Sequence, residues 1–120
     1  MMQRRPRRNV ARHLRFVSER PCIICGNYIC DAHHLKFADG RILKPISSNI
    51  GMKADDRFTL PLCRDHHEEA HRMAGRPFWQ KYCFADPVLI ALALFSITGD
   101  EEEGDRLIIH AMHAACTIRG

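Results

Sequence analysis

The spacing of apolar and polar positions predicts a small domain that combines helices with one pair of strands. Residues 10–19 place their apolar side chains at helical intervals, which is typical of a short amphipathic helix. Residues 29–37 form a candidate first strand, and residues 58–62 alternate as expected for the second strand of a hairpin. Pro61 fits this second strand only near its end or on a sheet edge. Residues 64–73 are rich in helix formers and predict a helix directly after the hairpin.

Helices are also expected in the last third of the chain. Asp86 and Pro87 form a helix-start signal, with the Asp as N-cap and the Pro in the first turn, for a helix that reaches about residue 97. Residues 107–118 have the apolar content of a last helix. Residues 38–54 contain glycines, serines and a proline, and they predict a long loop of the kind that is often functional.

Composition narrows the class of protein. The chain has 120 residues, which is enough for one domain. Its longest apolar stretch, residues 88–95, is much shorter than the about 20 residues that span a bilayer. The basic N-terminus lacks the apolar segment of a secretory signal, so we expect a cytoplasmic protein that does not enter a membrane. Six Cys and eight His then indicate metal ligands rather than disulfides.

Positive charge is concentrated at the start of the chain. Residues 1–20 carry seven arginines against one glutamate, a net charge of +6, whereas the whole chain carries +4. Such an arm suits a polyanion such as nucleic acid, although a solvated tail that aids solubility remains an alternative. We expect residues 1–9 to be a basic flexible arm and residues 10–120 a single domain. Within that domain the metal core covers about residues 21–75 and the C-terminal helical part residues 78–120.

Two ligand pairs predict a structural zinc site. Cys22-x-x-Cys25 is followed 38 positions later by Cys63-x-x-His66. Two intervening residues let a turn or the first turn of a helix direct both ligands at one ion, and two such pairs complete a tetrahedral site. One Cys-x-x-Cys alone could be a redox motif, and buried free thiols would leave the matched spacing unexplained.

Four further histidines predict a second site. His67 and His71 are four apart on a predicted helix and therefore share a face. His33 and His34 are adjacent on a predicted strand, where neighbouring side chains point to opposite faces. If His33 points toward the helix it becomes the third ligand, and His34 lies beside the metal without binding it. Three His ligands leave coordination positions open, as in catalytic sites.

These residues resemble a known family. The segments CIIC, DAHHL and DDRFTLPLCRDHHEEAH resemble the HNH endonucleases, whose ββα-metal fold places a hairpin and one helix around a metal ion. The resemblance implies that His33 binds the catalytic metal and that His34 is the general base. His66 replaces the second Cys of the family's Cys-x-x-Cys-His run, and His67 takes its last His. His71 resembles the extra ligand of the colicin DNase branch.

The resemblance extends over about residues 12–97 and is greatest for a small phage- and prophage-associated HNH branch. The recombination-promoting phage nuclease is similar to that branch at a greater distance. The middle Asn of the family pattern has no counterpart five residues before Cys63, where Phe58 stands. Asp55 and Asp56 are the candidates for its place. We predict that Asp56 orients the base histidine or braces the loop, although a solvated loop carboxylate would look the same in sequence.

The expected fold class is therefore α+β, with a ββα-metal (His-Me finger) core, a zinc knuckle and flanking N- and C-terminal helices. The resemblance implies metal-dependent hydrolysis of DNA phosphodiester bonds that leaves 5′-phosphate and 3′-hydroxyl ends. The catalytic ion would be Mn, Ni, Mg or Zn, and three imidazoles favour Zn, Ni, Co or Mn over Mg. Seven cationic residues are candidates for contacts with the DNA backbone: Arg4, Arg5, Arg7, Arg8, Lys53, Arg57 and Arg64.

Two other functions stay open from the sequence. A zinc-stabilised nucleic-acid-binding module without catalysis would need the Cys and His pairs but not His34. A zinc module for protein interaction would leave the arginine arm without a role. The apolar C-terminal helices could complete a monomer core or form a homodimer seam.

Overall fold

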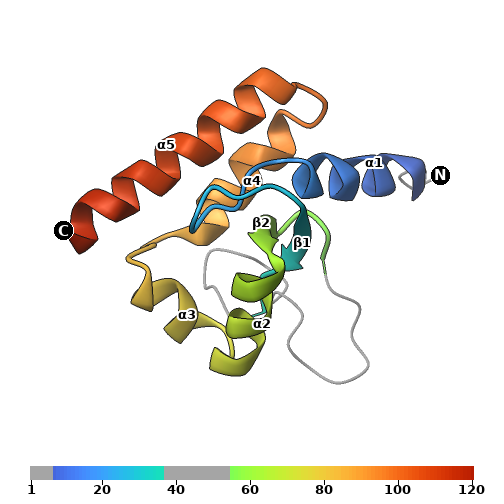
Figure 1. Cartoon of the computed structure of the whole chain (residues 1–120). Coiled ribbons are helices and arrows are strands. Elements are labelled where there is room, and N and C mark those ends of the chain that lie inside the picture. Colours follow the sequence, from blue (N-terminus) through green and yellow to red (C-terminus); the bar gives the residue numbers. More distant parts are fainter. Residues whose placement is uncertain (1–6, 37–54) are drawn as a thin grey trace.

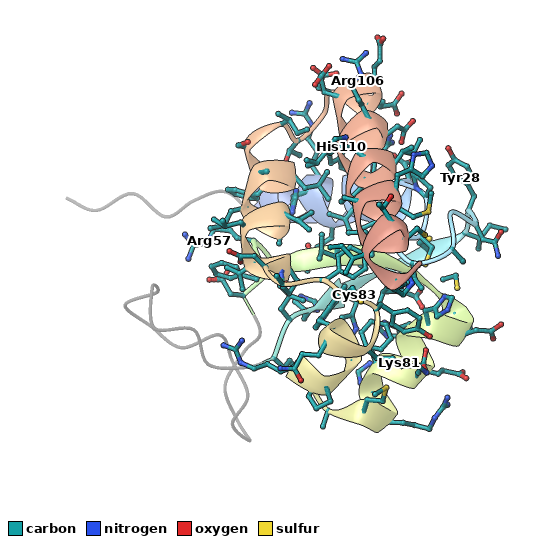
Figure 2. The ribbon with its side chains drawn as sticks, turned by 90° about the vertical axis from the view of Figure 1, so that its left-hand side faces the viewer. Tyr28, Arg57, Lys81, Cys83, Arg106 and His110 are labelled. Carbon is teal, nitrogen blue, oxygen red and sulfur yellow. The ribbon has the colours of Figure 1, made fainter. Side chains whose placement is uncertain are left out.

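The structure is a computed structural model that describes residues 7–36 and 55–120. It has an α+β fold in which a two-stranded sheet is surrounded by helices (Figure 1). The elements in the described part are α1 (Arg7–Ser18), β1 (Cys30–His34), β2 (Thr59–Cys63), α2 (Arg64–Met73), α3 (Arg76–Lys81), α4 (Pro87–Ser96) and α5 (Glu101–Arg119). The hairpin lies between α4 and α5 on one side and α2 and α3 on the other (Figures 1 and 2).

The hairpin sets the geometry of everything around it. β1 and β2 are antiparallel, with His33 opposite Leu60 and His34 opposite Thr59. β1 is shorter than the predicted strand, because Ile29 has a left-handed φ of 65° that interrupts extended backbone just before it. The carbonyl of Pro61 accepts a hydrogen bond of 3.1 Å from the backbone N–H of Ile23, outside the β1 ladder. Pro61 therefore occupies an edge position, as its missing N–H requires.

Helix α2 follows β2 without a loop, because Cys63 ends the strand and Arg64 begins the helix. Its bounds match the predicted residues 64–73. The helix ends at Ala74, which is left-handed and donates its N–H to the carbonyl of Ala70. A strand joined directly to a helix leaves little freedom between them, so the register of β2 determines which helical residues face the hairpin.

Helix α1 begins three residues earlier than predicted. Residues 7–9 belong to its first turn rather than to the basic arm, and residues 1–6 of the arm lie outside the described residues. The side chain of His13 is buried, and its Nδ1 lies 2.7 Å from the hydroxyl of Thr98 between α4 and α5. Arg20 is also buried and donates to the carbonyl of Phe16 at 3.0 Å.

The part of the chain after residue 75 consists of three helices and the short segments that join them. Helix α3 was not predicted, and it places Phe78 and Trp79 in the core. Asp86 caps α4 as expected by accepting the N–H of Leu89. Helix α5 begins at Glu101, six residues before the predicted start. None of the helices in the described segments is long and apolar enough to cross a membrane.

Candidate metal centres

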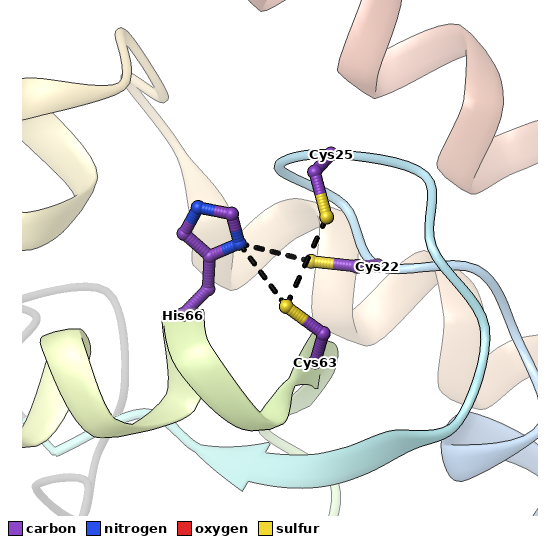
Figure 3. A group of neighbouring side chains, drawn as sticks. All are labelled: Cys22, Cys25, Cys63 and His66. Carbon is purple, nitrogen blue, oxygen red and sulfur yellow. Dashed lines mark hydrogen bonds between the residues drawn. The ribbon is translucent and has the colours of Figure 1, made fainter.

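Three elements bring the four predicted zinc ligands together. Cys22 and Cys25 come from the turn after α1, Cys63 from the end of β2, and His66 from the first turn of α2 (Figure 3). Their ligand atoms all lie within 4.8 Å of one another. The two sulfurs of Cys25 and Cys63 are 3.8 Å apart, and Nδ1 of His66 lies 3.2 Å from the sulfur of Cys63 and 3.7 Å from that of Cys22.

These separations fit a tetrahedral zinc ion. With Zn–S bonds of about 2.3 Å and Zn–N bonds of about 2.0 Å, two sulfurs lie about 3.8 Å apart and a sulfur and a nitrogen about 3.5 Å apart. Three thiols and one imidazole are also a donor set that structural zinc sites use. The cluster can therefore hold a metal such as zinc.

The backbone of the knuckle, residues 22–27, explains how two of these thiols converge. The N–H of Cys22 donates to the carbonyl of Asn27, and the N–H of Gly26 donates to the carbonyl of Cys22, both at 2.8 Å. Gly26 has a φ of 80°, which favours glycine. A hydrogen bond from the buried thiol of Cys30, helped by backbone N–H groups, lowers the pKa of Cys22 to about 4. A lowered pKa favours the thiolate of Cys22, the form that binds metal.

His66 has an aromatic neighbour that the sequence did not reveal. The ring of Tyr82 meets the His66 ring edge-on, with centroids 5.6 Å apart. The Tyr82 hydroxyl donates to Glu69 at 2.6 Å, and Lys81 pairs with the same carboxylate. Lys81 ends α3 and Tyr82 is its C-cap, and the sequence carries no clear signal for this short helix, so the contact does not follow from the sequence.

The second cluster consists of His33, His67 and His71. One ring nitrogen from each lies within 4.8 Å of the others. Nδ1 of His33 lies 3.1 Å from Nδ1 of His67, and Nε2 of His67 lies 3.1 Å from Nε2 of His71. Burial, together with the positive charge that His67 and His71 can carry, lowers the pKa of His33 to about 3. The imidazole of His33 is therefore neutral near pH 7, as a metal ligand must be.

His34 lies on the other face of β1 and is not part of this cluster. Its Nε2 lies 2.7 Å from a carboxylate oxygen of Asp56. An ionised carboxylate only accepts hydrogen bonds, so Nε2 is the donor, and the neutral tautomer that fits this contact has its lone pair on Nδ1. Asp55 instead accepts from the backbone and the guanidinium of Arg57, at 3.0 and 2.8 Å. Of the two candidate carboxylates, Asp56 is the one that contacts His34.

Two solvent-open hollows border the histidine cluster. The larger has a volume of about 440 Å³ and is lined in part by His67 and His71. The smaller has a volume of about 210 Å³ and includes His33 and the edge of Trp79 in its wall. His34 lines both hollows, so a molecule in either one can reach a histidine of the cluster and His34 together.

The predicted DNA-contacting cations fall into three groups. Arg57 is paired with Asp55 and lies at the surface (Figure 2), while Arg64 faces Asp31 at 3.6 Å beside the larger hollow. Arg7 and Arg8 are placed by the backbone of α1 only. The remaining three lie outside the described residues: Arg4, Arg5 and Lys53.

Comparison with known proteins finds one matching family. A family model described as a protein of unknown function, DUF968, matches residues 1–90 and so includes both ligand sets. The chain is also similar to the uncharacterized protein YdfU of Escherichia coli strain K12, with 42% identity over 60 residues. That stretch is 50% of this chain and 15% of YdfU, so the chain spans only a small part of its relative. No solved structure matches the chain.

Proposed function

The chain belongs to the DUF968 family, and we propose that it is a metal-dependent DNA endonuclease of the HNH type, with β1, β2 and α2 as a ββα-metal core. One observation carries the proposal. His34 is held by Asp56 and opens onto both hollows, yet it belongs to neither ligand set. A site that only held a metal would not need an oriented histidine next to it. A hydrolase needs such a group to activate water.

Different residues have different roles in the proposed reaction. Nδ1 of His34 accepts a proton from the attacking water, and Asp56 holds the ring in the required tautomer and stabilises the imidazolium that forms. His33, His67 and His71 would hold a divalent ion such as Mn, Ni or Zn. When bound, the ion supplies Lewis-acid stabilisation of the phosphate charge and of the departing 3′ oxygen. The expected products carry 5′-phosphate and 3′-hydroxyl ends.

The Cys22, Cys25, Cys63 and His66 site has a different role in this proposal. Zinc there would join the knuckle to β2 and to the first turn of α2. Because His67 follows His66 directly on that helix, the structural ion would also position the catalytic ligand. Such a site stabilises the fold by coupling metal binding to folding.

Cleavage of plasmid DNA by purified protein, with Mn or Ni added, tests the proposal. We expect nicking or linearisation that a chelator abolishes. His34→Ala should lower the rate by about 10²–10⁴-fold, the usual effect of removing a general base, without lowering metal content or DNA affinity. His110→Ala, at an exposed histidine of α5, is the matched control and should cleave at the parental rate.

A second pair of variants tests the role of the carboxylate. Asp56→Asn can present its amide N–H to His34 and favour the wrong tautomer, so cleavage should fall by at least about tenfold. Asp55→Asn removes an equal charge one residue away and should have a much smaller effect. If His34→Ala cleaved as fast as the parent protein, the mechanism would be wrong. DNA binding without cleavage in every metal would favour a non-catalytic, zinc-stabilised nucleic-acid-binding module.

A further inference from the structure

The two hollows beside the histidine cluster share a narrow common wall. Three residues line both of them: His34, Lys36 and His71. Asp31 and Arg64 line only the larger hollow, and Trp79 lines only the smaller. A DNA strand that occupies both hollows can therefore contact all three of these side chains.

Lys36 differs from its two partners in this wall. His34 is the proposed base and His71 a proposed metal ligand, whereas Lys36 is a lysine with no role in either ligand set. Arg64 is the other cation that lines the larger hollow, but Asp31 lies 3.6 Å from it and it does not reach the smaller hollow. Lys36 is thus the one residue that offers a full positive charge to both hollows within the described part of the chain.

The backbone before Lys36 is firmly held. The N–H of Leu35 donates to the carbonyl of Phe58 at 2.8 Å, and the Leu35 side chain is buried. Lys36 comes directly after this anchor and is exposed. Its Cα is therefore fixed close to the histidines, and no residue in the described segments forms an ion pair with its ammonium group.

We propose that Lys36 binds the phosphate of the DNA backbone at which cleavage occurs. This inference rests on the proposed nuclease function and adds a substrate-binding residue to it. Lysine binds phosphate as a point charge with three donors. Negative charge on the phosphate increases as water attacks, so the ammonium stabilises the transition state more than the bound substrate.

Single-turnover cleavage with saturating protein separates this role from simple DNA attraction. Lys36→Met should lower the cleavage rate of the bound complex by about 10- to 100-fold. DNA affinity, measured in a His34→Ala background, should fall only a few-fold. Lys36→Arg keeps the charge and should recover most of the rate. Arg106→Met, at an exposed arginine of α5 that lines neither hollow, is the matched control and should change both the bound rate and the DNA affinity less than about threefold.

The possible outcomes are distinct. If the parent protein cleaves and Lys36→Met cleaves at the same saturated rate, the inference is wrong and the nuclease function stands. The same conclusion follows if Lys36→Met loses its metal, since Lys36 would then act on the ligands and not on the phosphate. If the parent protein fails to cleave with any divalent metal, the proposed function fails and the role of Lys36 fails with it.

Discussion

His66 and His67 are neighbours in sequence but belong to different clusters of candidate metal ligands. Consecutive residues of an α-helix are about 100° apart around its axis, since 3.6 residues complete a turn. His66 therefore faces the knuckle, with Nδ1 3.2 Å from the Cys63 sulfur, while His67 faces β1, with Nδ1 3.1 Å from that of His33. One turn of α2 supplies ligands to both centres.

Alanine substitutions at this pair should have different consequences. His66→Ala removes a ligand of the zinc site, so we expect loss of about one zinc per chain and marked destabilisation. His67→Ala removes a ligand of the second centre. We expect a stable fold, weaker binding of the second metal, and activity that partly returns when the metal concentration is raised. Elemental analysis and thermal unfolding of both variants measure these effects.

Glu68→Ala, at the next and exposed position of α2, is the control for a nonspecific effect of changing this helix. It should leave metal content, stability and cleavage unchanged. If His66→Ala stayed fully stable while His67→Ala unfolded, the assignment of the two histidines would have to be reversed.

Helix α1 is tied to the rest of the molecule through a buried histidine. His13 lies close to Thr98, beyond α4, and its edge-on ring contact with Phe95 has a centroid distance of 4.8 Å. Burial lowers the pKa of His13 from 6.5 to about 4. The folded protein therefore holds this ring neutral over a range in which the unfolded chain protonates it.

Because of this pKa shift, the free energy of unfolding depends on pH below neutrality. Between pH 6.5 and 4 the unfolded state binds more protons at His13, so the free energy of unfolding falls as the pH is lowered. At pH 5 the loss from His13 should be about 2 kcal/mol, since each pH unit corresponds to about 1.4 kcal/mol. His13→Gln removes the titration, so its loss of stability between pH 7 and 5 should be smaller by that amount.

Urea unfolding of both proteins at the two pH values, with the same metal content, measures the difference. The metal ligands also protonate in acid, but they do so in both proteins and cancel in the comparison. An identical loss in parent and variant would show that His13 is not held neutral in the folded state.

At the scale of the whole molecule, the last helix meets the end of the first helix at one close contact. Gly104 of α5 lies against α1, and a Cβ added there would be 2.6 Å from Cζ of Phe16 and 3.1 Å from Cδ of Arg20. The buried guanidinium of Arg20 also donates to the carbonyl of Glu101 at 2.9 Å. The absence of a side chain at Gly104 lets these two distant segments approach.

Gly104→Ala should therefore destabilise the protein although alanine favours helices. Forcing Phe16 and Arg20 aside should cost about 1–3 kcal/mol, which exceeds the gain of about 1 kcal/mol in helix propensity. Phe16→Leu in the same chain makes room for the methyl group, so the double variant should lose less than the sum of the two single variants. Additive losses in urea unfolding would show that the two residues do not meet.

Patterns over short stretches of sequence predicted several of the secondary-structure elements and both ligand sets. The bounds of α2, the hairpin and the start of α4 follow from periodicity and capping, which depend on neighbouring residues. The two ligand sets were predictable because two residues between ligands, or four along a helix, determine which side chains can reach one ion. The start of α5 could not be fixed from the sequence, because the acidic run at residues 100–105 fits either an exposed turn or a helix start. In the structure Asp100 caps that turn, and Arg106 pairs with Glu102 on the same helix.

Contacts between distant segments required the folded chain. Asp56 reaches His34 across 22 positions, and no spacing distinguished it from Asp55 until the hairpin placed both residues. Tyr82 at His66 and Lys36 between the two hollows depend on how α3, β1 and α2 pack around one another. Secondary structure and ligand spacing are local because backbone hydrogen bonds and chelation act over a few residues. The surroundings of each site arise from burial and packing, which join residues far apart in the chain.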